Sequence, residues 1–564
     1  MTQVKGFCLY SKFIFRRERI TSLIWTMSII LFNTVVAAAF MQLFPDDVSM
    51  RQMVETLSMP AMQAIVGPIY GPSVNMLYAS EHVAMVFAQE MLVFMMLASV
   101  IMNIFLINRH TRADEELGRI EMIRSLPAGR LTVSVSALVF AFGLNIFISV
   151  LTALAMLLIN IAGTTVAGAF IYSFAIGAVG FLFACITLLT AQVFQNARSA
   201  SAWAFALLGI FYGVRAYADM SGEIIFNYIS PLGLGLHVHA FHANRIMPLI
   251  ILFIQGLILA FISLVICAKR DLGEGVIPAK KGRRNASVFL KSPLGLAWRL
   301  SKGSVIAWVI TMLALGATYG AVIGDIGGFV ETNEMFNQLI VGGDEELAAL
   351  LEYLAENPEA AEAFAEEANK KMADNFIAFI YLITALLATV PVITISGKIN
   401  AEEKRGRLEG IFARSVSRPA MFCSYLLIAI VGGALFMICG ALGIYAGTAS
   451  SGLAEAGDLI SASLTYIPSL LVMTGINVLL IGLAPKIKAL IWAVFAYSFI
   501  TVYFGKLLDL PEILPKMTPY GVIPQYTDIV SRNIDIKSII ILTAISAVLT
   551  VSGVLAFMRR DIKQ

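Results

Sequence analysis

Charged residues are scarce in this sequence. Only 14% of the 564 residues are charged, whereas 59% are hydrophobic and the mean hydropathy is +0.82. A soluble domain carries about 25% charged residues, so this composition excludes an ordinary soluble protein. The hydrophobic residues form runs of about 17 to 28 residues, and about 20 suffice for a helix to cross the roughly 30 Å hydrocarbon core of a bilayer. The sequence predicts an all-α polytopic membrane protein.

Paired cysteines, catalytic residue sets and phosphate-binding loops are also lacking. The five cysteines show no paired spacing, which argues against a disulfide framework or a zinc site. His237, His239 and His242 have no cysteine or carboxylate nearby, so we expect interfacial histidines and no metal. No Gly-x-x-x-x-Gly-Lys-Ser/Thr and no Ser/His/Asp set occurs in the chain. We therefore predict no catalytic residue and no cofactor bound by this chain; any ATP must be bound by another polypeptide.

Twelve apolar segments are predicted to span the membrane. They lie at about 20–44, 83–107, 131–158, 166–193, 201–217 and 247–267, and at about 304–323, 376–397, 420–446, 462–484, 489–505 and 538–557. Of the 40 Lys and Arg residues, 31 fall in the N-terminus, the C-terminal tail and alternate loops, the pattern of a cytoplasmic side. Both termini are predicted to be cytoplasmic, and six spans in each half predict two parallel repeats.

The predicted domains follow this division. Residues 1–270 form a six-span half that begins with a basic amphipathic stretch, interpreted as an interfacial helix. Residues 271–288, rich in Gly, Pro, Lys and Arg, form a cytoplasmic linker, and residues 289–564 form the second half. Within the second half, the acidic segment 331–374 predicts a helical excursion outside the membrane.

A charged motif recurs in the loop after the second span of each half. Asp114-Glu115-Glu116-Leu117-Gly118-Arg119-Ile120-Glu121 is matched 288 residues later by Glu402-Glu403-Lys404-Arg405-Gly406-Arg407-Leu408-Glu409. Ser230-Pro231-Leu232-Gly233 and Thr518-Pro519-Tyr520-Gly521 show the same displacement, and Trp25 and Trp308 lie 283 residues apart. The internal repeat therefore extends beyond a single motif.

Each charged loop is predicted to be a short amphipathic helix. Glu115 and Arg119 lie four residues apart, a spacing at which helical side chains pair. The predicted apolar faces, which would press on the membrane protein, are Leu117, Ile120, Ile123 and Leu126 in the first copy and Leu408, Ile411, Phe412 and Val416 in the second. A solvated loop that merely fixes topology is the alternative, and two copies in matching loops argue against it.

These loops and the Ser/Thr-Pro-x-Gly elements resemble those of type-2 ABC exporter permeases. The closest likeness is to twelve-span polyketide-antibiotic (tetronasin-type) exporters. The resemblance implies the type-2 architecture and a separate ABC ATPase, in two copies, that holds ATP and Mg. It also implies coupling residues Glu115, Gly118, Arg119, Glu121, Glu403, Gly406, Arg407 and Glu409, and an external re-entrant element containing Pro231, Gly233, Pro519 and Gly521.

A few polar residues lie within the predicted spans. Glu90 is a carboxylate inside the second span, where an ionisable group is costly and marks a cavity or a partner. We expect it either to line a substrate path or to lie near the outer interface. Asn145 and Asn477 either line the same path or bond between helices, and the second role is favoured. Arg215 and Asp219 are predicted to pair.

The sequence thus predicts the transmembrane subunit of an ATP-driven exporter in a bacterial cytoplasmic membrane. Its partners would be the ATPase, membrane lipid and a hydrophobic drug, antibiotic or lipid-like substrate, and not nucleic acid; the substrate class follows mainly from the resemblance. A proton- or sodium-coupled twelve-span secondary transporter is the alternative, because Glu115-x-x-Gly118-Arg119 is similar to the Asp-x-x-Gly-Arg loop of major-facilitator proteins. A membrane enzyme is disfavoured, because no catalytic cluster is evident.

Overall fold

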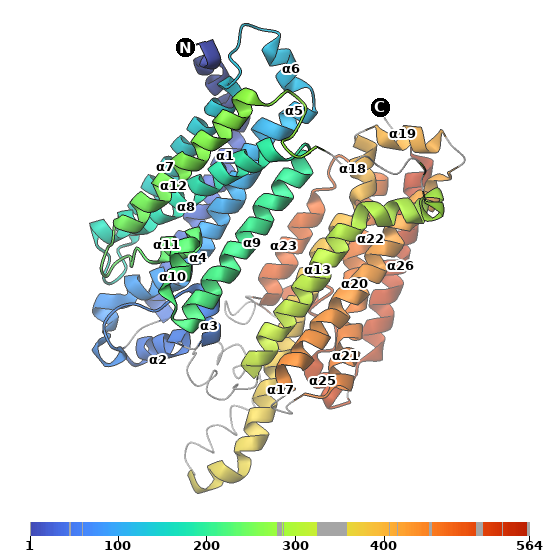
Figure 1. Cartoon of the computed structure of the whole chain (residues 1–564). Helices are drawn as coiled ribbons and strands as arrows, with labels where there is room; N and C mark the ends of the chain where they lie inside the picture. The colour runs from blue at the N-terminus through green and yellow to red at the C-terminus, as the bar shows by residue number, and fades with distance from the viewer. Residues whose placement is uncertain are drawn as a thin grey trace. The chain divides into compact units, whose positions relative to one another are not determined.

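The computed structural model resolves a helical chain in two units. It describes residues 2–43, 47–58, 60–278, 285, 287–323, 358–404, 406–413, 416–449, 454–503, 511, 513–532 and 534–560. Over these residues the chain forms helices and no strand, apart from one isolated bridge between Phe194 and Ile277. The two compact units are Met1–Gly282 and Arg283–Gln564 (Figure 1).

The first unit contains six long helices, which supply its membrane spans. They are α1 (Phe7–Leu43), α4 (Ala79–Asn108), α7 (Thr132–Ile159), α8 (Val166–Val193), α9 (Ala197–Ser221) and α12 (Met247–Lys269). Short helices connect them at the end away from the N-terminus: α2 (Asp47–Ser58), α3 (Pro60–Val66), α10 (Ile224–Ile229) and α11 (Pro231–Leu236). All six long helices are apolar enough to cross a bilayer.

The second unit repeats this order, except that its fourth span is divided into two helices. Its spans are α13 (Pro293–Ile323), α17 (Pro358–Ser396), α20 (Arg418–Thr448), the pair α21 (Ala456–Thr465) and α22 (Ile467–Leu483), α23 (Leu490–Tyr503) and α26 (Ile536–Arg559). Short helices include α18 (Lys398–Lys404), α19 (Arg407–Phe412), α24 (Ile513–Lys516) and α25 (Tyr526–Val530).

Three helix pairs pack alike in the two units. In the first, α1 packs on α7, α4 on α8, and α8 on α12; in the second, α13 packs on α20, α17 on α22, and α22 on α26. The centre of the first unit is tight because small residues let helices approach closely. A Cβ on Gly180 of α8 would stand 2.1 Å from Ser99 Oγ and 2.6 Å from Asn145 Oδ1. The repeat seen in the sequence is therefore also a repeat of packing.

The prediction of many spans is confirmed, with differences in the second unit. Eleven helices in the described part of the chain are long and apolar enough to span a membrane. The predicted span 462–484 lies within the apolar span Ala456–Leu483. This span is divided, since α21 ends at Thr465 and α22 begins at Ile467, because Pro468 in the first turn of α22 has no N–H to continue the preceding helix. The predicted span 489–505 corresponds to α23, only 14 residues long, and residues 504–510 lie outside the described part.

Two stretches that were predicted to lie outside the membrane spans are continuous with spanning helices. The basic stretch interpreted as an interfacial helix is the first part of α1, which runs unbroken from Phe7 to Leu43. The acidic excursion 331–374 lies outside the described residues up to 357, and its remainder begins α17, which runs from Pro358 to Ser396. The division between units falls in the predicted linker 271–288, of which residues 279–284 and 286 lie outside the described part.

The Ser/Thr-Pro-x-Gly elements share one side-chain hydrogen bond, which caps α11 in the first unit and closes a turn in the second. Ser230 Oγ accepts a hydrogen bond from the N–H of Gly233, and Pro231 opens α11. Thr518 Oγ1 likewise accepts from the N–H of Gly521 at 3.2 Å. A Cβ on Gly233 would meet Asn227 O at 2.7 Å, and one on Gly521 would meet Pro515 O at 2.1 Å. Glycine is therefore required at both positions by close backbone approach.

A buried charge pair and a histidine loop close the same end of the first unit. Arg215 Nη1 lies 3.2 Å from Asp219 Oδ2, which confirms the predicted pairing. Arg215 also donates to the carbonyl of Ala64, and Asn227 donates to Asp219.

After α11, the ring of His239 stacks on Tyr70 with centroids 4.4 Å apart. The structure thus places this histidine on an aromatic ring, where a charged imidazolium would be poorly solvated.

Acidification is expected to weaken this loop. Burial, with help from Arg245, His237 and His242, lowers the pKa of His239 to about 4, whereas an unfolded histidine has a pKa of about 6.5. Between these values the unfolded chain binds the additional proton, so the free energy of unfolding falls as the pH drops from about 6.5 to about 4. His239→Asn, which tolerates the positive φ of 47°, should flatten this dependence in thermal denaturation between pH 7.5 and 4.5. Parallel curves for variant and wild type would contradict the assignment.

Candidate coupling site

Each charged loop folds as a helix, a left-handed glycine and a second short helix. In the first unit, α4 continues through a π-helical turn, Arg109–Ala113, into α5 (Asp114–Glu116), and α6 (Arg119–Arg124) follows Gly118. In the second, α18 precedes Gly406 and α19 follows it. Gly118 has φ 71° and ψ 3°, and Gly406 has φ 66° and ψ 10°. The repeated sequence therefore specifies a repeated backbone turn, at the end of each unit that carries its chain terminus in Figure 1.

Replacing Gly406 by alanine should loosen this turn. A Cβ there would meet nothing within 4 Å, so the penalty is the left-handed backbone alone, about 1–2 kcal/mol. Hydrogen exchange of residues 406–413 should accelerate roughly 5- to 30-fold. Gly410→Ala is the matched control: it also meets open space but lies inside α19, where alanine is favoured. If Gly406→Ala and Gly410→Ala accelerated hydrogen exchange equally, the left-handed backbone of Gly406 would not be the cause.

A glutamate–arginine clamp joins each loop to the sixth span of its own unit. Glu115 accepts from Arg270 Nη2 at 2.7 Å and from the N–H of Gly273 at 2.7 Å. In the second unit, Glu403 accepts from Arg560 Nη2 at 2.7 and 2.6 Å. Arg270 and Arg560 are the C-caps of α12 and α26. The same carboxylate in each motif thus holds the last residue of the same span.

A second arginine in each unit completes the clamp. Arg130, just before α7, donates to the carbonyl of Arg270. Arg418, at the start of α20, donates to the carbonyl of Arg560 at 3.1 Å. Because these carbonyls lie at helix C-termini and lack partners within the helix, cations there are favourable. The third span, the sixth span and the loop are therefore joined through one partly buried charge network in each unit.

The first loop is anchored more extensively than the second. Asp114 binds both Arg17 of α1, at 2.5 Å, and Arg119, at 2.8 Å. In the second unit Glu402 binds Arg407 at 3.3 Å, and Leu300 stands at the repeat position of Arg17, 283 residues later. Glu116 also accepts from the N–H of Ala197, the first residue of α9, at 2.8 Å. The two loops are therefore held to their units by different sets of contacts.

The predicted pairing within the first loop is wrong. Arg119 binds Asp114, whereas Glu115 binds Arg270 and Arg112. The left-handed Gly118 breaks the helix between positions 115 and 119, so the four-residue spacing no longer brings these side chains together. The predicted apolar face is wrong in part for the same reason: Ile120 is buried, but Leu117 and Leu126 are exposed.

The outer surface of each loop carries exposed charged residues. Arg119 and Glu121 are exposed in the first copy, and Arg407 and Glu409 are exposed in the second. Ile120 and Leu408, which occupy the same repeat position, are both buried and hold each loop on its unit. The exposed Met122 is replaced by Gly410 in the second copy. The two outer surfaces are therefore alike in charge and unlike in apolar content.

Sequence reasoning missed the arginines of the clamp. Arg130 and Arg418 keep the 288-residue displacement and could have been found by extending the repeat, but Arg270 and Arg560 are 290 residues apart. Glu115 and Arg270 are separated by 155 positions. No local spacing rule connects residues so distant, so only the packing of α12 beside the loop reveals the pair.

The two asparagines bond between helices. Asn145 of α7 exchanges hydrogen bonds with Asn103 of α4 at 2.9 and 3.0 Å. Asn477 of α22 donates to Ser396 Oγ of α17 at 2.9 Å. Both are buried, so their amides satisfy one another or the neighbouring helix. The structure shows the bonding between helices that was favoured for them, and the substrate-path role stays a prediction.

Glu90 lies on the less buried stripe of α4. The same stripe carries Phe94, Leu97 and Phe105. Its Oε2 atom is inaccessible to solvent and has no hydrogen-bond partner in the described part of the chain. A buried carboxylate oxygen without a partner is costly, which makes this the most conspicuous unsatisfied group of the first unit's spans.

The fold defines a multi-pass helical membrane protein built from two similarly packed units, each with a clamped, charged loop. Comparison with known proteins agrees. The chain is 28% identical over 560 residues to the multidrug efflux system permease protein Rv1217c of Mycobacterium tuberculosis, covering 97% of this chain and 94% of that protein. The family model for the C-terminal domain of that permease matches residues 290–355 and 345–558. The similarity supports the efflux-permease part of the predicted resemblance; the tetronasin-type family stays a prediction.

Proposed function

We propose that this chain is the transmembrane permease of an ATP-driven multidrug exporter in a bacterial cytoplasmic membrane. The observation that carries the proposal is the repeated clamp, in which Glu115 and Glu403 each tie a charged loop to the end of a sixth span. A separate ABC ATPase, in two copies, docks on the outer surfaces of the loops. Similarity to a multidrug efflux permease over both units supports export of drugs; that these drugs are hydrophobic is what the predicted resemblance implies.

The clamp explains how a movement of the loop is transmitted to the membrane-spanning helices. A loop that moved independently would transmit nothing to the spans. Glu115 binds the C-cap of α12, and Arg130 ties the start of α7 to the same residue. A displacement of the loop by the ATPase is therefore carried to two further helices through charge-assisted bonds, which are the strong class of hydrogen bond. The same transmission operates through Glu403, Arg560 and Arg418 in the second unit.

Unequal anchoring gives the two loops different mechanical roles. The first is held by α1 and α9 as well as by the clamp, so it moves with most of its unit. Among the described residues, the second has the clamp, the Glu402–Arg407 pair and one tie to α13, where Lys398 of α18 donates to the carbonyl of Leu300 at 3.0 Å. The second loop is therefore the more compliant docking point.

Glu90 is the proposed polar contact for substrate within the spans. Its unpartnered oxygen would accept a hydrogen bond from, or pair with, a cationic drug. Glu90→Gln keeps the shape and removes the charge, so export of cationic drugs should fall about tenfold while export of neutral drugs changes little. Drug accumulation in cells expressing each variant measures this. Unchanged export of every drug would remove Glu90 from the path.

Co-expression with a candidate ATPase tests the proposal as a whole. An ATPase with a phosphate-binding loop, encoded beside this gene, should co-purify with the full chain, and the complex should hydrolyse ATP. Failure of every such ATPase to bind, combined with drug export driven by an ion gradient, would favour the secondary-transporter alternative.

A further inference from the structure

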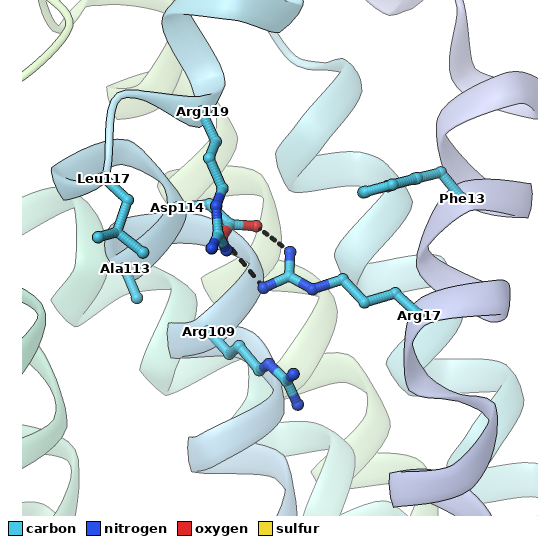
Figure 2. Close-up of a pocket in the computed structure, with 7 residues that line it drawn as sticks. All are labelled: Phe13, Arg17, Arg109, Ala113, Asp114, Leu117 and Arg119. Atoms are coloured by element: carbon cyan, nitrogen blue, oxygen red, sulfur yellow. Dashed lines mark hydrogen bonds and ion pairs between the residues drawn. The ribbon is translucent and has the colours of Figure 1, made fainter. Parts of the chain in front are cut away.

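A basic pocket opens between α1 and the first charged loop. It is an open hollow of about 480 Å³, and it is lined by Phe13, Arg17, Arg109, Ala113, Asp114, Leu117 and Arg119 (Figure 2). This volume is within the roughly 300–1,000 Å³ of small-ligand sites. Its three guanidiniums come from three separate elements: α1, the π-helical turn and α6. The clamp leaves this pocket unexplained, since neither Glu115 nor Arg270 lines it.

The accessible charge of the pocket is positive. Arg109 and Arg119 are 46% and 51% exposed, whereas the carboxylates that pair with them, Glu18 and Asp114, are 1% and 2% exposed. Asp114 is already occupied by Arg17 and Arg119, and Glu18 by Arg109 and His110. In the described part of the chain, Arg109 and Arg119 each use only Nη1 in these bonds. Their remaining N–H groups are available to an anion, and a guanidinium matches phosphate geometry.

An apolar stripe leads from the pocket along α1. Phe13 and Arg17 of the pocket are followed at helical spacing by Ile20, Ile24, Met27 and Leu31, positions that share one face of a helix. All four of these apolar residues are more than half exposed. Since α1 is apolar enough to span a bilayer, this face suits an acyl chain. The basic pocket lies at the end of the stripe where a lipid headgroup would sit.

We propose that this pocket binds the phosphate group of an anionic phospholipid, with an acyl chain along the α1 stripe. The lipid bridges α1 and the first charged loop, so it stabilises the more firmly held of the two loops. The site goes beyond the exporter assignment, because it requires only that the chain lies in a membrane. An acidic segment of a protein partner could use the same guanidiniums, but the apolar stripe favours a lipid.

Native mass spectrometry of the full chain tests this site. The protein is purified with an equal mixture of phosphatidylglycerol and phosphatidylcholine, and retained lipid is counted. Wild type should keep one phosphatidylglycerol in preference to phosphatidylcholine. Arg109→Gln should reduce that retention about tenfold, the effect of one charge-assisted hydrogen bond. Arg16→Gln is the matched control, because Arg16 is exposed on α1 but lies outside the pocket, and it should behave as wild type.

Three outcomes would overturn the proposal. Equal losses for Arg109→Gln and Arg16→Gln would show nonspecific attraction of anionic lipid to basic residues. Displacement of phosphatidylglycerol by millimolar inorganic phosphate would show a site for free phosphate. Unchanged lipid retention with loss of ATPase co-purification in Arg109→Gln would assign the pocket to the protein partner. Because lipid retention is measured without the ATPase, failure of the lipid site leaves the exporter proposal standing.

Discussion

Reversing Arg119 and Arg407 together to glutamate should abolish association with the ATPase. Both guanidiniums are more than half exposed, one in each loop, and each reversal places like charges where a complementary surface is proposed to dock. Like-charge juxtaposition across an interface costs several kcal/mol, so two reversals should weaken binding by at least about 100-fold. The measurement is the amount of ATPase that co-purifies with the full chain.

The repeat itself supplies the control. Arg16 and Arg299 are exposed repeat equivalents in α1 and α13, separated by the same 283 positions as Trp25 and Trp308. Arg16→Glu with Arg299→Glu makes the same change in charge outside the loops and should leave the ATPase bound. If the control pair released the ATPase equally, the loss of binding would be explained by the change in net charge and not by the position of the two arginines in the loops.

Breaking the first clamp should separate ATP hydrolysis from transport. In Arg270→Met the carboxylate of Glu115, 5% exposed, loses its 2.7 Å partner. Removing one partner of a buried ion pair costs about 3–5 kcal/mol, and Arg112, still 3.0 Å away, keeps the effect near the lower figure. The loop should still bind the ATPase, but drug exported per ATP hydrolysed should fall roughly tenfold or more.

Lys269→Met is the matched substitution for this experiment. It removes one positive charge from the neighbouring residue, which is exposed and in none of the clamp's contacts. It should keep the wild-type ratio of export to hydrolysis. If Arg270→Met also kept that ratio, the clamp would be a structural contact only and would not transmit force.

The span pattern and the repeated turn could be predicted from the sequence. Long apolar runs and their basic flanks are local signals, and they anticipated eleven spanning helices and the short α23. The glycines at 118 and 406 keep their displacement and also keep their left-handed backbone. Likewise Ser230 and Thr518 each accept a hydrogen bond from the glycine N–H three residues later. Where a residue type is needed for a local backbone conformation or hydrogen bond, that local structure can be predicted from the sequence alone.

Contacts between distant segments could not be predicted. The pairing of Arg119 depended on where the helix breaks, and Gly118 sends it to Asp114 instead of Glu115. The clamp joins residues 155 positions apart, and the basic pocket brings Arg17 of α1 beside Arg109 and Arg119. Such sites arise from packing of whole helices, which periodicity and charge counts do not determine.

Drug uptake into inside-out membrane vesicles tests the central claim most directly. Vesicles containing this chain and its ATPase are loaded with ATP, and uptake is followed with and without an uncoupler of the proton gradient. We expect ATP-dependent uptake that survives the uncoupler and is lost in the Arg119→Glu, Arg407→Glu variant. Uptake that stopped with the uncoupler while ATP was present, and that was unchanged in the variant, would contradict the account.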